Sequence, residues 1–224
     1  MSEERRHPLD LAFGGCLALI SAIDFYTARS LSLVAHVELS LVQIVQRLEE
    51  GMSIACALGV AALIVTWPFL ARPSHRCLTL AVLALQTLGL SLDVIGLLAS
   101  TLFGKRANPI YLLLEAALVH VATVLLFASW YAAIDHHRQV AHASGQPARQ
   151  RFAFPQHAGR YPGYEGWVPG FVDYLTLAFT TSSSLGPAEA LPLAPPAKML
   201  VTFQVSLSLV ILLVLAARAI GLIA

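Results

Sequence analysis

The sequence predicts an all-α integral membrane protein with about five transmembrane helices, an amphipathic helix and a re-entrant half-helix before the last span. Hydrophobic residues make up 57% of the 224 residues and charged residues only 12%, whereas about a quarter of the residues in soluble domains are charged. Several apolar windows reach the roughly 20 residues that a helix needs to cross a bilayer core about 30 Å thick. A short, polar and interrupted segment before the last window predicts the re-entrant element.

The first half of the chain, residues 1–108, contains three predicted spans. They cover about residues 11–28, 52–71 and 77–103. Between the first two, polar side chains recur at steps of four, three and four, on one helix face: His36, Ser40, Gln43 and Arg47. This stripe predicts an amphipathic helix over residues 29–50 that lies in the membrane interface or is buried with the stripe turned toward protein. The N-terminus lacks the pattern of a removable signal peptide, so the first span is expected to be retained.

The second half, residues 109–224, is predicted to form one unit. Its elements are a span over 109–134, a loop over 135–168, a half-helix over 169–181, a turn over 182–196 and a last span over 197–224. The half-helix has about three turns, too few to cross a membrane, and Gly186 and Pro187 interrupt the chain after it. Non-helical backbone at membrane depth is tolerated where it is buried in protein or lines a watery cavity. We therefore expect the chain to enter, turn and return.

This segment resembles the pore module of the potassium-channel superfamily. Laid on the channel pattern without a gap, it places Asp173, Leu175, Phe179 and Thr181 on pore-helix positions, Gly186 on the first filter glycine, Glu189 on the acidic residue, and Pro192 and Lys198 beyond it. The resemblance covers about 25 residues. It implies a fourfold assembly in which each chain contributes a pore helix, a filter and the last span.

The filter itself departs from the channel pattern. SSLGPAE stands where TTVGYGD would stand, so Pro187 replaces the tyrosine and Ala188 the second glycine. Proline and alanine resist the backbone angles that a filter of stacked carbonyls requires, so a multi-site potassium filter is not expected. The predicted pore residues are Thr180, Thr181, Ser182, Ser183, Ser184, Leu185, Gly186, Pro187, Ala188 and Glu189. Hydroxyls with one carboxylate per chain, Glu189, would form a wide, hydrated and less selective cation path.

The C-terminal half also resembles, more loosely, an uncharacterised family of bacterial membrane proteins with about five spans and a degenerate pore-like turn. Two functions stay open: an oligomeric cation channel, and a non-conducting structural or interaction protein that retains the pore-loop scaffold. The expected partners are membrane lipid, other copies in a homotetramer and an inorganic cation, in a bacterial inner or plasma membrane. No constellation for an enzyme is present.

Polar residues inside the spans are further candidates, because they are costly there. They are Asp93, Glu115, His120, Gln204, Ser208 and Arg218. Asp93 shares a helix face with Gln86, which suits close packing as well as an ion path. Glu115 and His120 point in different directions, so they form either a proton relay or separate hydrogen bonds. Gln204, Ser208 and Arg218 would face an inner vestibule, where an arginine opposes cation passage unless it is paired or at the interface.

No metal or cofactor site is predicted. The loop histidines either sense pH or bind a metal, or are simply solvated: His136, His137, His142 and His157. The net charge of +1 gives no footprint for nucleic acid. Orientation stays open, because the channel-like arrangement places most loop arginines outside whereas the positive-inside rule favours the reverse.

Overall fold

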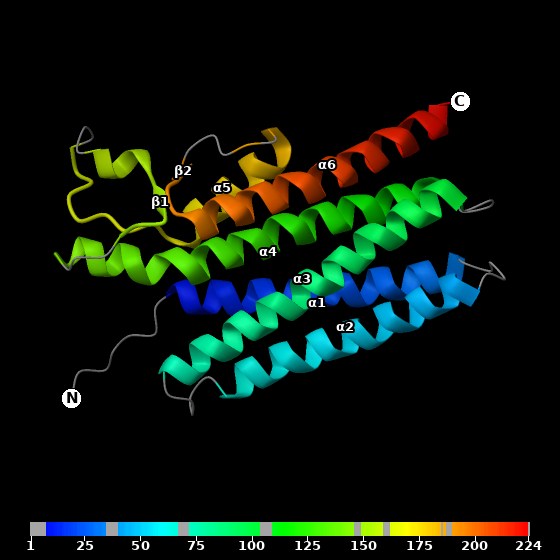
Figure 1. Cartoon of the computed structure of the whole chain (residues 1–224), viewed down its shortest axis with the longest axis horizontal. Coiled ribbons are helices and arrows are strands. Elements are labelled where there is room, and N and C mark those ends of the chain that lie inside the picture. Colours follow the sequence, from blue (N-terminus) through cyan, green and yellow to red (C-terminus); the bar gives the residue numbers. More distant parts are fainter. Residues whose placement is uncertain are drawn as a thin grey trace.

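The computed structural model describes residues 8–34, 40–66, 72–103, 109–145, 149–158, 162–184, 186 and 190–223. Within these residues the α-helices are α1 (Pro8–Val34), α2 (Ser40–Thr66), α3 (Arg72–Phe103), α4 (Pro109–Ala143), α5 (Phe171–Ser184) and α6 (Pro195–Ile223). A 3-10 helix, η1 (Pro155–Ala158), and two short strands, β1 (Phe152–Ala153) and β2 (Leu191–Pro192), complete them. Figure 1 shows the long helices side by side, with the short α5 beside α6. The all-α fold class is confirmed.

Within the described residues, four helices are long and apolar enough to cross a membrane, which indicates a membrane protein. These stretches are Arg47–Thr66 in α2, Ser74–Leu98 in α3, Ile110–Ala143 in α4 and Pro195–Ala217 in α6. The fifth expected span, residues 11–28, lies within α1. That α1 also crosses stays a prediction.

The separate amphipathic helix expected over residues 29–50 is not formed. Residues 29–34 complete α1, and residues 40–50 begin α2, which continues without a break to Thr66. No proline interrupts α2, and Glu49 is buried rather than solvated, so this polar segment extends a long helix of the bundle. Of the predicted stripe, Arg47 is exposed, His36 lies outside the described residues, and the side chains of Ser40 and Gln43 are not described.

The expected loop over residues 135–168 is wrong for its first nine residues, which are the last turns of α4. The sequence DHHRQVAHA contains no glycine or proline, so the helix continues past the apolar run. It ends just before Gly145, which has φ +77° and donates its N–H to His142 O at 3.0 Å. Glycine is the usual residue for this left-handed position after a helix. The half-helix is likewise longer than expected and ends at Ser184 rather than 181.

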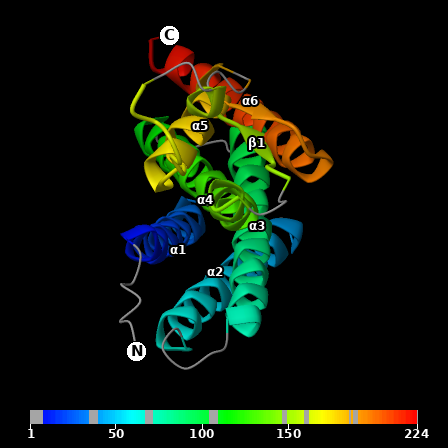
Figure 2. The ribbon, with the colours of Figure 1, turned by 90° about the vertical axis from the view of Figure 1, so that its left-hand side faces the viewer.

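Helix α4 lies at the centre of the fold and packs against α1, α3, α5 and α6. The end-on view in Figure 2 shows α1, α2 and α3 on one side of α4, and α5 and α6 on the other. One apolar core fills the α1–α4 side, with Leu17, Leu63 and Leu83 among its buried residues. A second core joins α4, α5, α6 and β1, around Phe127 and Phe152. The first core also includes Ile211 of α6, and a smaller cluster of Leu97, Ala116 and Val214 joins α3, α4 and α6, so the α1–α4 bundle and the α4–α6 unit share α4 and are packed together.

Helices α2 and α3 approach closely at Gly96. A Cβ added there would collide with Glu49 Oε1, a buried atom. We expect Gly96→Ala to lower the free energy of unfolding by about 1 kcal/mol, the low end of the usual cost of overpacking, because the Glu49 carboxyl group is the end of a flexible side chain that can turn aside. Gly51→Ala on α2 is the matched control, since its Cβ would meet nothing within 4 Å; alanine there should be neutral or stabilising, because it favours helix. Thermal unfolding in one detergent compares them, and equal stability would contradict the contact.

Candidate functional site

Helix α5 starts at one end of α4. The return segment, which leads from the end of α5 to β2, comes back to that same end. At the start, His136 Nδ1 of α4 lies 3.1 Å from Pro169 O, and Gly170 N donates to Asp173 Oδ2 at 2.7 Å. At the end, β2 pairs antiparallel with β1, with Phe152 opposite Pro192. The 14 residues of α5 rise about 21 Å, which is less than the roughly 30 Å of a bilayer core. Helix α5 therefore covers about two thirds of the thickness of a bilayer core, and the chain then returns to the end of α4 from which it started.

Asp135 on α4 fixes the base of this segment. It is fully buried. Its carboxylate accepts hydrogen bonds from Arg151 N at 2.7 Å, from Gln139 Nε2 at 2.7 Å and from Tyr174 OH at 3.2 Å. These bonds join α4 to the start of β1 and to α5. The sequence interpretation placed Asp135 in a solvated loop and missed this role; the signal was its i, i+4 spacing to Gln139 in a stretch without helix breakers.

Gln204 on α6 holds the other end of α5. Its Nε2 donates to Ala178 O and to Ser182 Oγ, each at 2.7 Å, and its Oε1 accepts a hydrogen bond from Tyr131 OH of α4. Ser208, one turn further along α6, donates to Ser182 Oγ at 3.1 Å. All these side chains are buried. The sequence predicted Gln204 and Ser208 as vestibule-facing residues, but within the single chain they face α5.

The predicted pore residues divide into two groups. Thr181 and Ser182 are fully buried, and Thr180 is partly buried with its hydroxyl bonded to Thr176 O at 2.9 Å. Ser183 and Ser184, at the end of α5, are exposed. Gly186 is partly buried, and the remaining predicted residues lie outside the described residues: Leu185, Pro187, Ala188 and Glu189. Among the predicted pore residues that the structure describes, only Ser183 and Ser184 in the last turn of α5 therefore have exposed hydroxyls.

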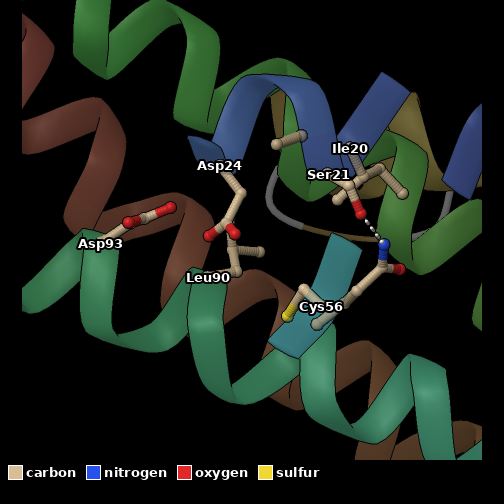
Figure 3. Close-up of a pocket in the computed structure, with 8 residues that line it drawn as sticks. Ile20, Ser21, Asp24, Cys56, Leu90 and Asp93 are labelled. Atoms are coloured by element: carbon tan, nitrogen blue, oxygen red, sulfur yellow. Dashed lines mark hydrogen bonds between the residues drawn. The ribbon is translucent and has the colours of Figure 1, made fainter. Parts of the chain in front are cut away.

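The other intramembrane candidates lie on the α1–α4 side. Asp93 and Glu115 are buried, each at 2% exposure, and His120 is partly buried. The side chain of Arg218 on α6 is not described. Asp93 and Gln86, which the sequence placed on one face, line a common cavity with Asp24 of α1, and Figure 3 shows the Asp24 and Asp93 side chains between α1 and α3. The sequence interpretation did not single out Glu49, because it assigned that residue to an amphipathic helix outside the predicted spans.

The segment after α4 is ordered around aromatic side chains. Phe154 packs edge-on against Trp167 and Tyr174, with ring centroids 5.7 Å apart in both pairs. Together with His142 and Gln156, His157 and Trp167 line a groove of about 320 Å³. Burial lowers the pKa of His157 below its ordinary value, so the ring is neutral at physiological pH. Among the described residues, no three His, Cys, Asp or Glu side chains are placed to hold a metal ion.

No family model, curated protein or solved structure matches this chain. Its function is therefore argued from the α5 segment and from the buried polar groups themselves.

Proposed function

We propose that the chain forms a homo-oligomeric pore for inorganic cations, in which α5 and its return segment dip into the membrane as a re-entrant loop. In this proposal α1, α2, α3, α4 and α6 cross a bacterial inner or plasma membrane, and copies meet around the end of α5, by analogy with the tetrameric channels that the segment resembles. The observation that carries the proposal is a short helix, α5, that starts at one end of α4, followed by a return segment that ends at the same end. The non-helical backbone of a return segment is tolerated at membrane depth where it is buried in protein or lines a water-filled cavity.

The exposed surface of α5 and α6 also supports assembly. Ser183 and Ser184 leave hydroxyls exposed at the end of α5. On α6, exposed residues recur at steps of four, three and four: Thr202, Ser206, Leu209 and Leu213. This stripe is polar near the start of α6 and apolar further along, as expected of a helix that lines a vestibule in the company of other copies. A single chain cannot enclose a path, so conduction requires an oligomer.

A non-conducting structural or interaction protein is the second candidate. The burial of Thr181 and Ser182, whose hydroxyls are bonded within the chain, favours it. In that case α5 is a scaffold element, and its exposed end contacts lipid or another protein.

Cysteine accessibility in proteoliposomes separates the two candidates. The background is Cys77→Ser, because Cys77 is exposed whereas Cys16 and Cys56 are buried. We expect a tetramer with sodium and potassium flux but no chloride flux. Modification of Ser184→Cys with a cationic thiol reagent should reduce this flux to the level of empty liposomes. Val172→Cys, at the exposed opposite end of α5, is the matched control and should keep its flux.

A second variant tests the acid that the sequence places after the turn. Glu189 lies outside the described residues, and Glu189→Gln should lower cation flux because a carboxylate concentrates cations near a pore mouth. A monomer or dimer without flux would refute the pore and leave the scaffold function.

A further inference from the structure

The interior of the α1–α4 bundle contains four acidic side chains, one from each helix. They are Asp24, Glu49, Asp93 and Glu115, and none is more than 8% exposed. The last three lie within the stretches of α2, α3 and α4 that can cross a membrane. An acidic residue at the centre of a membrane helix costs roughly 2.5–3.5 kcal/mol on insertion scales, which makes each one a candidate for function.

Asp24 and Asp93 form a carboxyl pair. Both groups line one small cavity, and Figure 3 shows them between α1 and α3. Thr27 Oγ1 lies 3.3 Å from Asp93 Oδ2, whereas Asp24 Oδ2 and Ser53 Oγ of α2 are buried without a hydrogen-bond partner in the described residues. A carboxylate has no donor, so two carboxyl groups that approach each other can form a hydrogen bond only when one of them holds a proton. Like charges this close in a buried site do not both persist.

A small cavity adjoins the pair and contains an unused acceptor. It measures about 10 Å³ and is lined by Asp24, Asp93, Gln86, Ser21, Cys56 and three apolar residues. That volume is close to the minimum, about 10–15 Å³, for one water molecule. Gln86 is 3% exposed, and its Nε2 donates to Leu17 O and to Ser21 Oγ, each at 3.1 Å. Its Oε1 has no hydrogen-bond partner in the described part of the chain, and neither has Asp24 Oδ2, so two residues of the cavity wall keep buried acceptors unused.

The space and the arrangement of the acids favour a proton over a metal ion. The electrostatic neighbours of Asp93 are Asp24 and Glu49, and those of Glu49 are Asp24 and Glu115. From α2, Cys56 also faces the pair. Within the described residues no metal-binding group of three such side chains is formed. A proton neutralises one carboxyl group and needs only the space of a hydrogen bond or one water molecule.

The acids lead toward one end of the bundle. Glu49 and Glu115 lie near the starts of α2 and α4, about 14 Å and 9 Å along them at 1.5 Å per residue. A Cβ at Gly96, one turn beyond Asp93 on α3, would meet Glu49 Oε1, so Glu49 continues the polar path in that direction. Toward the other end, buried apolar residues close the bundle, among them Leu17, Leu63 and Leu83.

We propose that Asp24 and Asp93 form a proton-binding site inside the α1–α4 bundle, which exchanges its proton through Glu49 and Glu115 with water at the end where α2 and α4 begin. One proton moves from water onto a carboxylate oxygen of the pair and leaves by the same route, since apolar residues close the other side. His120 on α4, partly buried with Nδ1 unpartnered in the described residues, is the remaining titratable group of α4 in this part of the bundle. The site involves neither α5 nor α6, so it stands independently of the proposed pore.

Infrared spectroscopy of the full-length protein in liposomes tests the site. A buried protonated carboxyl group gives a C=O stretching band distinct from the carboxylate bands. We expect this band at neutral pH in the wild type, its loss in Asp93→Asn and its loss or shift in Asp24→Asn. Glu165→Gln, which changes an exposed carboxyl group, is the matched control and should leave the band unchanged.

The route is tested by the rate at which the band shifts after transfer into heavy water. Glu115→Gln and Glu49→Gln should keep the band and slow its shift, because each removes one carboxyl group from the path. Equal rates in both variants and the wild type would overturn the route. A wild-type spectrum without the band, or a band that responds to added sodium at constant pH, would overturn the proton site, and neither readout depends on a variant that folds.

Discussion

Asp135→Asn is expected to lower the free energy of unfolding by about 3 kcal/mol. This is among the largest losses of stability that we expect from replacing a single carboxyl group by an amide in this chain. The buried carboxylate accepts from three donors: Arg151 N, Gln139 Nε2 and Tyr174 OH. Asparagine has one carbonyl oxygen and presents an NH₂ group to the remaining donors. Hydrogen bonds to a charged group contribute about 1.5–3 kcal/mol each, and a buried donor left without an acceptor costs about 1–3 kcal/mol.

Asp173→Asn is the matched control for this prediction. Asp173 Oδ2 accepts one hydrogen bond, from Gly170 N at 2.7 Å, at the partly buried start of α5. The carbonyl oxygen of asparagine can accept the same hydrogen bond from Gly170 N, and the lost charge near the helix start contributes little, so we expect a change of less than about 1 kcal/mol. Chemical unfolding in one detergent compares the two variants, and limited proteolysis within residues 149–167 reports release of the segment that Asp135 holds. If both variants lost the same stability, Asp135 would not be the anchor of α5.

Much of the fold follows from local sequence. The long apolar helices were predictable because apolar runs of bilayer length are separated by turn residues, and the short helix α5 because glycine and proline follow a short apolar run. The end of α4 was not predictable in this way, because the apolar run stops at Ile134 whereas the helix continues with buried Asp135 and Gln139. Hydropathy predicts which part of a helix can face lipid. Asp135 and Gln139 are buried against protein, so hydropathy gives no information about them.

The buried acids show a second limit of the sequence. Asp93 and Glu115 were predictable as candidates from their place inside apolar spans. Their grouping with Asp24 and Glu49 was not, because each acid comes from a different helix and no spacing along the chain relates them. The same holds for Gln204, which meets α5 and α4 through tertiary contacts alone.

Gln204→Leu is expected to lower the free energy of unfolding by about 2–3 kcal/mol, since it leaves buried partners unsatisfied at about 1–3 kcal/mol each. Leucine has nearly the same volume, so the loss comes from the hydrogen bonds to Tyr131 OH, Ser182 Oγ and Ala178 O. Ser206→Leu is the matched control two residues away. Its side chain is exposed and bonds only to Thr202 O, so its effect should stay within about 0.5 kcal/mol.

A double variant isolates the contact between α4 and α6. Adding Tyr131→Phe to Gln204→Leu removes the hydroxyl that the first change leaves unpartnered, so the double variant should be more stable than the sum of the single losses predicts, by about 1 kcal/mol. Additive losses would mean that Tyr131 and Gln204 do not interact.

The same variants bear on function: because Gln204 fixes the end of α5, a conducting oligomer should lose cation flux in Gln204→Leu even at temperatures where the protein stays folded. A scaffold protein should show the stability loss alone.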